Sequence, residues 1–229
     1  QAVLINQVSG PLFIDIANEY VAKYDNVVLI TGTLESTYAE IDDRINVVYK
    51  ATYRRNKSSL RIITWLLFYI QVCLHLLLKG KRYEKALVVT NPPIMPFLGS
   101  KLLPKMKIRF DILIYDVYPD ALSNFGYIKV NSFLYKYWDT ISEKSYQNAD
   151  RVITISSEMK KQISRNVNKD KIEIIYPWVD TSFISPLKKE DNWFVKKHGL
   201  SGKKIILYSG NMGITHDLLT PLKVAKNIE

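Results

Sequence analysis

Apolar residues occur along this chain in two alternating kinds of block. Short uninterrupted apolar runs at 2–6, 26–33 and 45–51 are typical of strands that are buried on both faces of a sheet. Longer stretches beginning at Pro11 and Leu60 have apolar residues every three or four positions, which predicts helices. Further strands are expected at 85–91, 110–120, 149–156 and 171–177. This order predicts an α/β fold with a doubly wound, parallel, Rossmann-like sheet.

A polar stretch with glycine signals separates this sheet from the end of the chain. We expect an N-terminal domain over residues 1–185, a linker over 186–202, and the start of a second domain over 203–229. That start reads as a strand at Ile205–Tyr208, a glycine-bearing loop and a helix at Leu218–Ile228. One strand cannot form a parallel sheet, so we expect the chain to be a fragment of a two-domain protein.

Composition and charge limit the classes of binding partner and the kinds of reactive or metal-binding site that we expect. The formal net charge of +10 predicts an anionic partner: nucleic acid, a phosphorylated substrate or an acidic membrane surface. No nucleic-acid-binding motif is recognised, so nucleic acid is not expected. The single cysteine, Cys73, lies in an apolar run, which indicates a buried, inert thiol and a reducing cytosol. Cysteine and the three histidines lack zinc-type spacing, so no metal site is expected.

The helix at 60–78 is long and apolar enough to raise the question of a membrane. Basic residues precede it from Lys50 to Arg61 without one acid, and three more follow at 79–82. Three interpretations stay open: burial in the domain, contact with an anionic bilayer, and a true membrane span. The residues predicted to contact a membrane are Arg54, Arg55, Lys57, Arg61 and Trp65.

Polar residues follow the predicted strands, where ligands of open α/β sheets bind. Asp116 and Asp120 come after an apolar strand, where an aspartate costs desolvation unless it has a task or a partner. Both are candidate catalytic acids, and the alternative is a helix cap or loop brace. Ser9, Gly10 and Asn91 follow two other strands and are candidates for binding the acceptor, in a cleft suited to sugar or phosphate.

The loop SGNMG, followed by His216, resembles a phosphate cradle. Its glycines let backbone N–H groups approach an anion, and the N-terminus of the next helix adds a favourable dipole. Gly210, Asn211, Gly213 and His216 are therefore candidates for binding the diphosphate of a donor. An ordinary structural turn is the alternative.

Six motifs together resemble a GT-B glycosyltransferase of family 4, of the bacterial type that builds surface polysaccharides such as capsule or O-antigen. They are TNPP at 90–93, DVYPD at 116–120, ADRVITISSEMKKQI at 149–163, KIEIIYPWVD at 171–180, FISP at 183–186 and YSGNMGITHD at 208–217. The resemblance implies the N-terminal domain, which binds acceptor, and the opening of the C-terminal domain, which binds a nucleotide-sugar.

The resemblance also implies roles for single residues. Asp116 stands where the family has a catalytic-site acid or histidine. Gly210, Asn211 and Gly213 stand where a loop approaches the donor diphosphate. Gly10 matches the glycine turn after the first strand, although Ser-Gly-Pro replaces the commoner double glycine. The family's paired glutamates, which hold the donor, belong to a later part of the C-terminal domain, so residues 1–229 alone are expected to be inactive.

The function implied is retaining, metal-independent transfer of a hexose, without a cofactor, from a nucleotide-sugar to a polyprenyl-diphosphate-linked glycan. The expected location is the cytoplasmic, inner face of the cell membrane, as a peripheral protein. The alternative is a non-catalytic sugar- or nucleotide-binding module of similar fold.

Overall fold

The computed structural model of this chain describes residues 1–229 apart from a few positions, and it divides into two units. The positions left out are Thr37, 55–57, Asn166, 182–183, Asn211, 213–216 and 228–229, together with the side chain of Ser58. The first unit is Gln1–Val179 and the second is Asp180–Glu229. The division therefore falls before the expected end of the first domain at residue 185.

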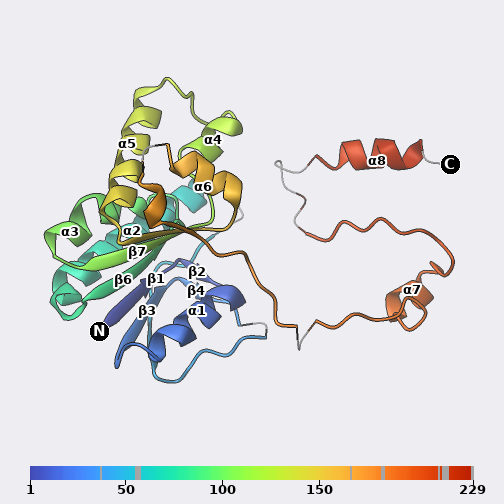
Figure 1. Cartoon of the computed structure of the whole chain (residues 1–229), viewed down its shortest axis with the longest axis horizontal. Coiled ribbons are helices and arrows are strands. Elements are labelled where there is room, and N and C mark those ends of the chain that lie inside the picture. The colour runs from blue at the N-terminus through green and yellow to red at the C-terminus, as the bar shows by residue number, and fades with distance from the viewer. Residues whose placement is uncertain are drawn as a thin grey trace. The chain divides into compact units, whose positions relative to one another are not determined.

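Seven parallel strands form the sheet of the first unit (Figure 1). In sheet order they are β5 (Ile45–Tyr49), β3 (Val27–Thr31), β1 (Ala2–Ile5), β6 (Lys85–Val89), β7 (Arg109–Ile114), β8 (Arg151–Thr154) and β9 (Ile172–Ile174). A small parallel pair joins β2 (Val8–Ser9) to β4 (Thr33–Leu34). The predicted α/β, doubly wound class is confirmed, with the strand order reversing between β1 and β6.

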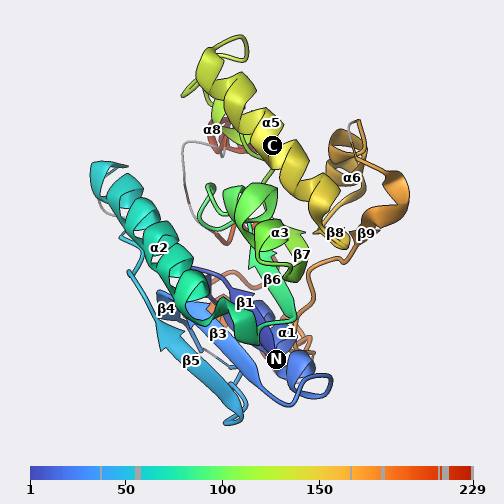
Figure 2. The same ribbon diagram turned by 90° about the vertical axis from the view of Figure 1, so that its left-hand side faces the viewer.

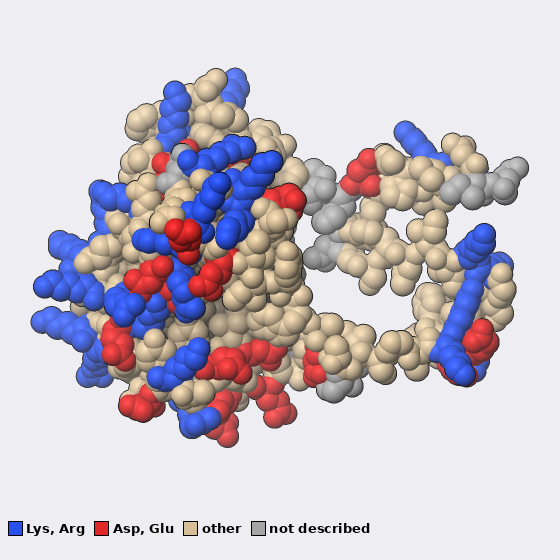
Figure 3. Space-filling view, viewed as in Figure 1, with Lys and Arg blue, Asp and Glu red and all other residues tan. Residues whose placement is uncertain are grey.

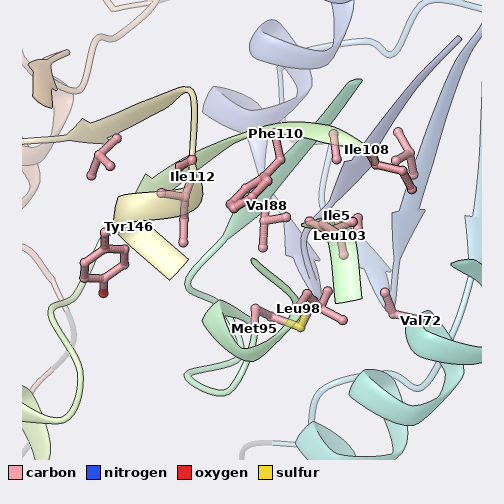
Figure 4. Close-up of a cluster of buried hydrophobic side chains, with 14 of the residues drawn as sticks. Ile5, Val72, Val88, Met95, Leu98, Leu103, Ile108, Phe110, Ile112 and Tyr146 are labelled. Atoms are coloured by element: carbon pink, nitrogen blue, oxygen red, sulfur yellow. The ribbon is translucent and has the colours of Figure 1, made fainter. Parts of the chain in front are cut away.

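Helices cover both faces of this sheet. They are α1 (Pro11–Val21), α2 (Ser58–Lys79), α3 (Leu103–Lys105), α4 (Asp120–Asn124), α5 (Phe133–Asn148) and α6 (Ser157–Ile163), with short turns η1 (Gly80–Arg82), η2 (Leu98–Leu102) and η3 (Lys169–Lys171). On one face, Val72 of α2 and Tyr146 of α5 belong to the same buried cluster as Phe110 of β7 (Figure 4). On the other face α1 packs through Phe13 and Ala17. Figure 2 shows α2 and α5 in front of the sheet.

The strands are uninterrupted apolar runs because both of their faces are covered. All four residues of β1 are fully buried, and so are most of those in β3, β6 and β7. Their side chains alternate between the two clusters: Val3 and Ile5 join the α2 side, whereas Leu4 joins the α1 side. Burial on both faces therefore fixes the register of each strand.

A buried ionic network ties the first residues of β6, β7 and β8 together. The Asp111 carboxylate is fully buried and accepts from Lys85 Nζ at 2.7 Å and from Arg151 Nη2 at 2.8 Å. Lys85 Nζ also donates to Asp150 at 2.9 Å, and Arg109 Nε reaches Asp150 at 3.0 Å. This network lies at the amino ends of the strands, opposite the edge where ligands bind.

The second unit contains two helices, α7 (Trp193–Lys197) and α8 (Leu219–Lys226). The structure has no strand at Ile205–Tyr208, so that part of the expectation is not met. A strand needs a hydrogen-bonded neighbour, and the described residues of this unit supply none. The expected helix is present as α8. The assignment of 203–229 to a second domain stays a prediction.

Candidate functional site

The loops after β1 and β6 meet at the point where the strand order reverses. In an open α/β sheet this is where a ligand crevice forms. The backbone N–H of Gln7 donates to the carbonyl oxygen of Asn91 at 3.1 Å, so the two loops are held together. Asn91 itself is half-buried. The edge formed by these loops and by the loop after β7 is the candidate site.

Two buried polar side chains at this edge, Asn6 and Gln7, were not singled out from the sequence. Gln7 Nε2 donates to the carbonyl oxygens of Ala51 and Thr64, both at 3.1 Å, and so joins the loop after β5 to α2. Gln7 Oε1 and Asn6 Oδ1 have no hydrogen-bond partner among the described residues. Buried polar atoms are nearly always paired, so these two mark a site that a ligand or water can complete. Their signal was a polar pair directly after an apolar strand.

The predicted acceptor residues after β1 differ in accessibility. Ser9 is fully buried, and its Oγ lies 3.0 Å from Thr31 Oγ1. Ser9 therefore joins β2 to the end of β3 in this structure and does not face solvent. Gly10 caps α1, and a Cβ placed on it would meet no atom within 4 Å. Of these two residues, Gly10 is the one next to open space.

Asp116 lies just beyond β7, on the strand next to β6. Its side chain reaches the surface and makes no hydrogen bond or ion pair with any residue that the structure describes. The surrounding protein nevertheless excludes part of the water from the carboxyl, which raises its pKa. An unpaired carboxyl with a raised pKa at the ligand edge can accept a proton or orient a hydroxyl.

Tyr118 connects Asp116 to the first turns of α2. Burial raises the pKa of the Tyr118 phenol, Asp116 and Tyr53 raise it further, and the Arg61 guanidinium opposes them. Arg61 also lies over Trp65, 5.8 Å from the ring centroid. Asp116 and Arg61 therefore both act on the Tyr118 phenol, and Arg61 and Trp65, which were predicted to contact a membrane, lie in the first turns of α2.

Asp120 is engaged on both of its carboxylate oxygens. Tyr135 Oη donates to Oδ1 at 2.6 Å, and Gln162 Nε2 donates to Oδ2 at 2.8 Å. These bonds join α4 to α5 and α6. The geometry favours the loop brace over the catalytic acid that we expected at this position.

The helix α2 is half core and half exposed surface. Phe68, Val72 and Leu76 are fully buried against the sheet. The opposite side exposes a row of large apolar side chains, which we call the α2 stripe: Ile62, Ile63, Leu66, Leu67, Ile70, Leu74, Leu77 and Leu78. The interpretation that the helix is wholly buried in the domain is therefore wrong. Residues 59–82 are long and apolar enough to cross a membrane, but one side of the helix is already occupied by the protein core.

The residues predicted to contact a membrane fall in different places on this helix. Arg54 is exposed in the preceding loop, whereas Arg61 and Trp65 lie half-buried beside the α2 stripe. The Trp65 ring stacks on Tyr53 with centroids 6.3 Å apart. Arg55 and Lys57 lie outside the described residues.

Comparison with known proteins identifies the family. The sequence profile described as Glycosyltransferase Family 4 matches residues 12–183, about three quarters of the chain. The chain belongs to glycosyltransferase family 4. A curated relative from Pseudomonas aeruginosa, named "Probable glycosyltransferase WbjE", is 24% identical over 153 residues, which cover 65% of this chain and 38% of the relative. This family 4 chain therefore spans well under half the length of that relative.

Two solved structures resemble the fold more distantly. A UDP-glucosyltransferase from Polygonum tinctorium is 10% identical with a TM-score of 0.47, covering 85% of this chain and 56% of its own. The apo UGT2 of Phytolacca americana is 9% identical with a TM-score of 0.47, covering 96% and 68%. Likeness at this level supports no inference about the family 4 chain.

The predicted donor loop lies in the second unit of the family 4 chain. Gly210 is exposed, and Asn211, Gly213 and His216 fall outside the described residues. Beyond the loop, Asp217 Oδ1 accepts from the backbone N–H groups of Leu219 and Thr220 at 3.1 and 3.2 Å. Asp217 therefore caps the start of α8, and the role of the loop stays a prediction.

Other chemistry in the described part of the family 4 chain is limited. Cys73 is a free, half-buried thiol whose pKa is raised by burial, which keeps it protonated and unreactive. Among the described residues, no group of three or more His, Cys, Asp or Glu could hold a metal ion. A cavity of about 160 Å³ on the α1 face is lined mainly by apolar side chains, including Leu12, Ile153 and Ile175.

Proposed function

We propose that this chain is the acceptor-binding part of a glycosyltransferase that moves a sugar from a nucleotide-sugar to a lipid-linked glycan. Membership of family 4 supports glycosyl transfer as the class of reaction. The observation that carries the assignment of the site is Asp116, a carboxyl with a raised pKa at the ligand edge of the sheet that has no partner among the described residues. Tyr118, whose phenol is influenced by both Asp116 and Arg61, follows Asp116 by two residues and adds a second polar group to this edge.

In this proposal Asp116 accepts a hydrogen bond from the attacking hydroxyl of the acceptor and orients it. A carboxylate with a raised pKa is a stronger proton acceptor than an ordinary one, which suits this task. The departing diphosphate is stabilised by backbone N–H groups of the loop at Gly210 and by cationic groups, in a retaining and metal-independent reaction. Donor-binding residues beyond this chain are part of the proposal, so residues 1–229 alone are expected to be inactive.

The acceptor is proposed to carry a polyprenyl diphosphate and to serve surface polysaccharide synthesis at the inner face of the cell membrane. The α2 stripe supports this, because an exposed apolar helix face flanked by basic residues suits an anionic bilayer. The flanking residues are Arg54, Arg61, Lys79, Lys81 and Arg82. The fully buried opposite face of α2 favours a helix lying on the membrane over one that crosses it.

The test uses the full-length protein with membranes that contain lipid-linked glycans and a panel of radiolabelled UDP-, GDP- and dTDP-sugars. Label entering the lipid extract identifies the donor, and Asp116→Asn should lower the rate of this transfer about a hundredfold or more. Transfer by the Asp116→Asn protein at the wild-type rate would remove Asp116 from the mechanism. Binding of a nucleotide-sugar without any transfer would instead favour the non-catalytic binding module.

A further inference from the structure

A second exposed apolar surface lies on the segment that leads from α4 into α5. Six large apolar side chains are exposed there, and we call them the α4–α5 patch: Phe125, Tyr127, Val130, Phe133, Leu134 and Tyr137. Phe133 is 84% exposed although it is one of the largest apolar side chains in the chain. Single exposed apolar residues are normal on proteins, but a contiguous group of this size marks an interaction surface.

The α4–α5 patch is held in a fixed conformation by the residues beneath it. Ser132 caps α5, its Oγ accepting from the backbone N–H of Tyr135 at 3.2 Å. The Tyr135 hydroxyl in turn donates to Asp120. Trp138 stacks on Tyr118 with ring centroids 6.2 Å apart. The packed side of α5 therefore stabilises a conformation in which the apolar side chains of the patch stay in solvent.

Charge within the patch is only positive. Lys129 and Lys136 are exposed among its apolar residues, and the sequence from Ala121 to Trp138 contains no Asp or Glu. Figure 3 shows basic and uncharged side chains at the tip of the first unit, where Figure 1 places α4 and the start of α5. Apolar and aromatic side chains interspersed with lysine match an anionic lipid surface, which accepts both kinds of group.

The patch and the α2 stripe belong to helices that pack on the same face of the sheet. Tyr69 of α2 packs against the buried cluster that also contains Tyr146 of α5. Phe97 contacts Tyr137 edge-on, with ring centroids 6.5 Å apart. Phe97 also contacts Trp138, which stacks on Tyr118, so the patch borders an aromatic cluster that ends two residues from Asp116 in the chain.

We propose that the α4–α5 patch is a second membrane-contact surface, which enters an anionic bilayer together with the α2 stripe. Two contact surfaces fix the orientation of the domain, which a single helix does not, and they direct the Asp116 edge toward the lipid surface. This inference rests on the proposed function, because a lipid-linked acceptor is what makes that orientation useful. It adds the residues of the patch to the machinery of that function.

Vesicle sedimentation with the full-length protein tests this inference. The vesicles are equimolar phosphatidylglycerol and phosphatidylcholine, with pure phosphatidylcholine for comparison. Phe133→Ser with Leu134→Ser should weaken binding to the anionic vesicles about tenfold or more, since each large apolar side chain contributes strongly when buried in lipid. Leu66→Ser with Ile70→Ser on the α2 stripe should have a similar effect. Far-UV circular dichroism checks that both variants remain folded.

The charge component has a matched control. Lys129→Glu with Lys136→Glu should lose binding to anionic vesicles, whereas Lys23→Glu with Lys169→Glu makes the same change in charge at exposed positions outside the patch and should bind like the wild type. As a second measurement, the fluorescence of Phe133→Trp should be quenched by brominated lipids more than that of Tyr49→Trp. Equal quenching would contradict the proposal.

The possible results distinguish failure of this inference from failure of the proposed function. If the α2 variant loses binding but the patch variants bind like the wild type, the patch is not a membrane surface, and the proposed function stands. If the wild type does not bind vesicles, the inference and the membrane part of the proposal both fall, while transfer in detergent still tests Asp116. If the wild type is a dimer that the patch variants dissociate, the patch is a self-association surface, and the inference is wrong.

Discussion

Replacing Asp111 by alanine should be among the most destabilising single changes in the first unit. Asp111 is fully buried, and its two oxygens accept from Lys85 at 2.7 Å and from Arg151 at 2.8 Å. Lys85 is only 8% exposed, and its ammonium group is bonded to Asp111 and to Asp150. Truncation of Asp111 removes the first of these carboxylates and leaves Asp150 as the partner of Lys85 in the described structure. A buried charge that loses its partner is costly, because water cannot replace the lost hydrogen bonds.

The expected loss is about 3–5 kcal/mol, the usual cost of breaking a buried ion pair from one side. Domains of this size are stable by about 5–15 kcal/mol, so Asp111→Ala should leave a marginal fold. Urea unfolding followed by circular dichroism measures the change. At a typical slope of about 2 kcal/mol per molar urea, the midpoint should fall by about 2 M.

Arg109→Ala is the matched control in the same network. Arg109 bonds Asp150 at 3.0 Å, but its side chain is 76% exposed, so its removal should cost no more than about 1 kcal/mol. Equal shifts of the urea midpoint in Asp111→Ala and Arg109→Ala would contradict this prediction. Such a result would mean that burial of Asp111 does not strengthen its ion pairs.

Three further changes have expected outcomes. Partial burial raises the pKa of Asp116 above its ordinary 3.8, so the charged carboxylate destabilises the folded state at neutral pH. Asp116→Asn should therefore have a higher melting temperature than the wild type at pH 7, and the difference should vanish as the pH approaches 3.8. Burial, aided by two nearby lysines, lowers the pKa of His75 below 6.5, so stability should fall as the pH drops below about 6.5, and His75→Gln should flatten that slope in pH-dependent urea unfolding. A Cβ at Gly32 would collide with the carbonyl oxygen of Ala51, so Gly32→Ala should destabilise the unit by about 1–3 kcal/mol, measured by thermal unfolding.

The sheet and its class could be predicted from the sequence because burial on both faces produces uninterrupted apolar runs. Six of the seven strands of the main sheet lie inside a run identified from hydrophobicity alone, and β7 begins one residue before its run. The exposed half of α2 could not be predicted in this way, since the helix is apolar all round and only packing shows which side faces the sheet. The strand expected at 205–208 is absent from the structure for a related reason, because a strand depends on a neighbouring strand that the local sequence does not specify.

The site was predictable only in part. Asp116 was found because an aspartate after an apolar strand requires an explanation. The hydrogen bonds of Asp120 could not be predicted, because its partners Tyr135 and Gln162 are 15 and 42 residues away along the chain. The burial of Ser9 likewise depends on Thr31, which only the folded sheet brings near. Contacts between distant residues decide such roles, and no local pattern encodes them.

The rate of sugar transfer to a lipid-linked acceptor by full-length Asp116→Asn tests the central claim most directly. Asp139→Asn is the control, since it removes another carboxyl with a raised pKa, which lies on α5 and not in the loop after β7. If Asp116 orients the acceptor hydroxyl, Asp116→Asn should lower kcat about a hundredfold or more, while the KM for the donor and the activity of Asp139→Asn stay close to wild type. Wild-type kcat in Asp116→Asn, or equal losses in both variants, would contradict the account.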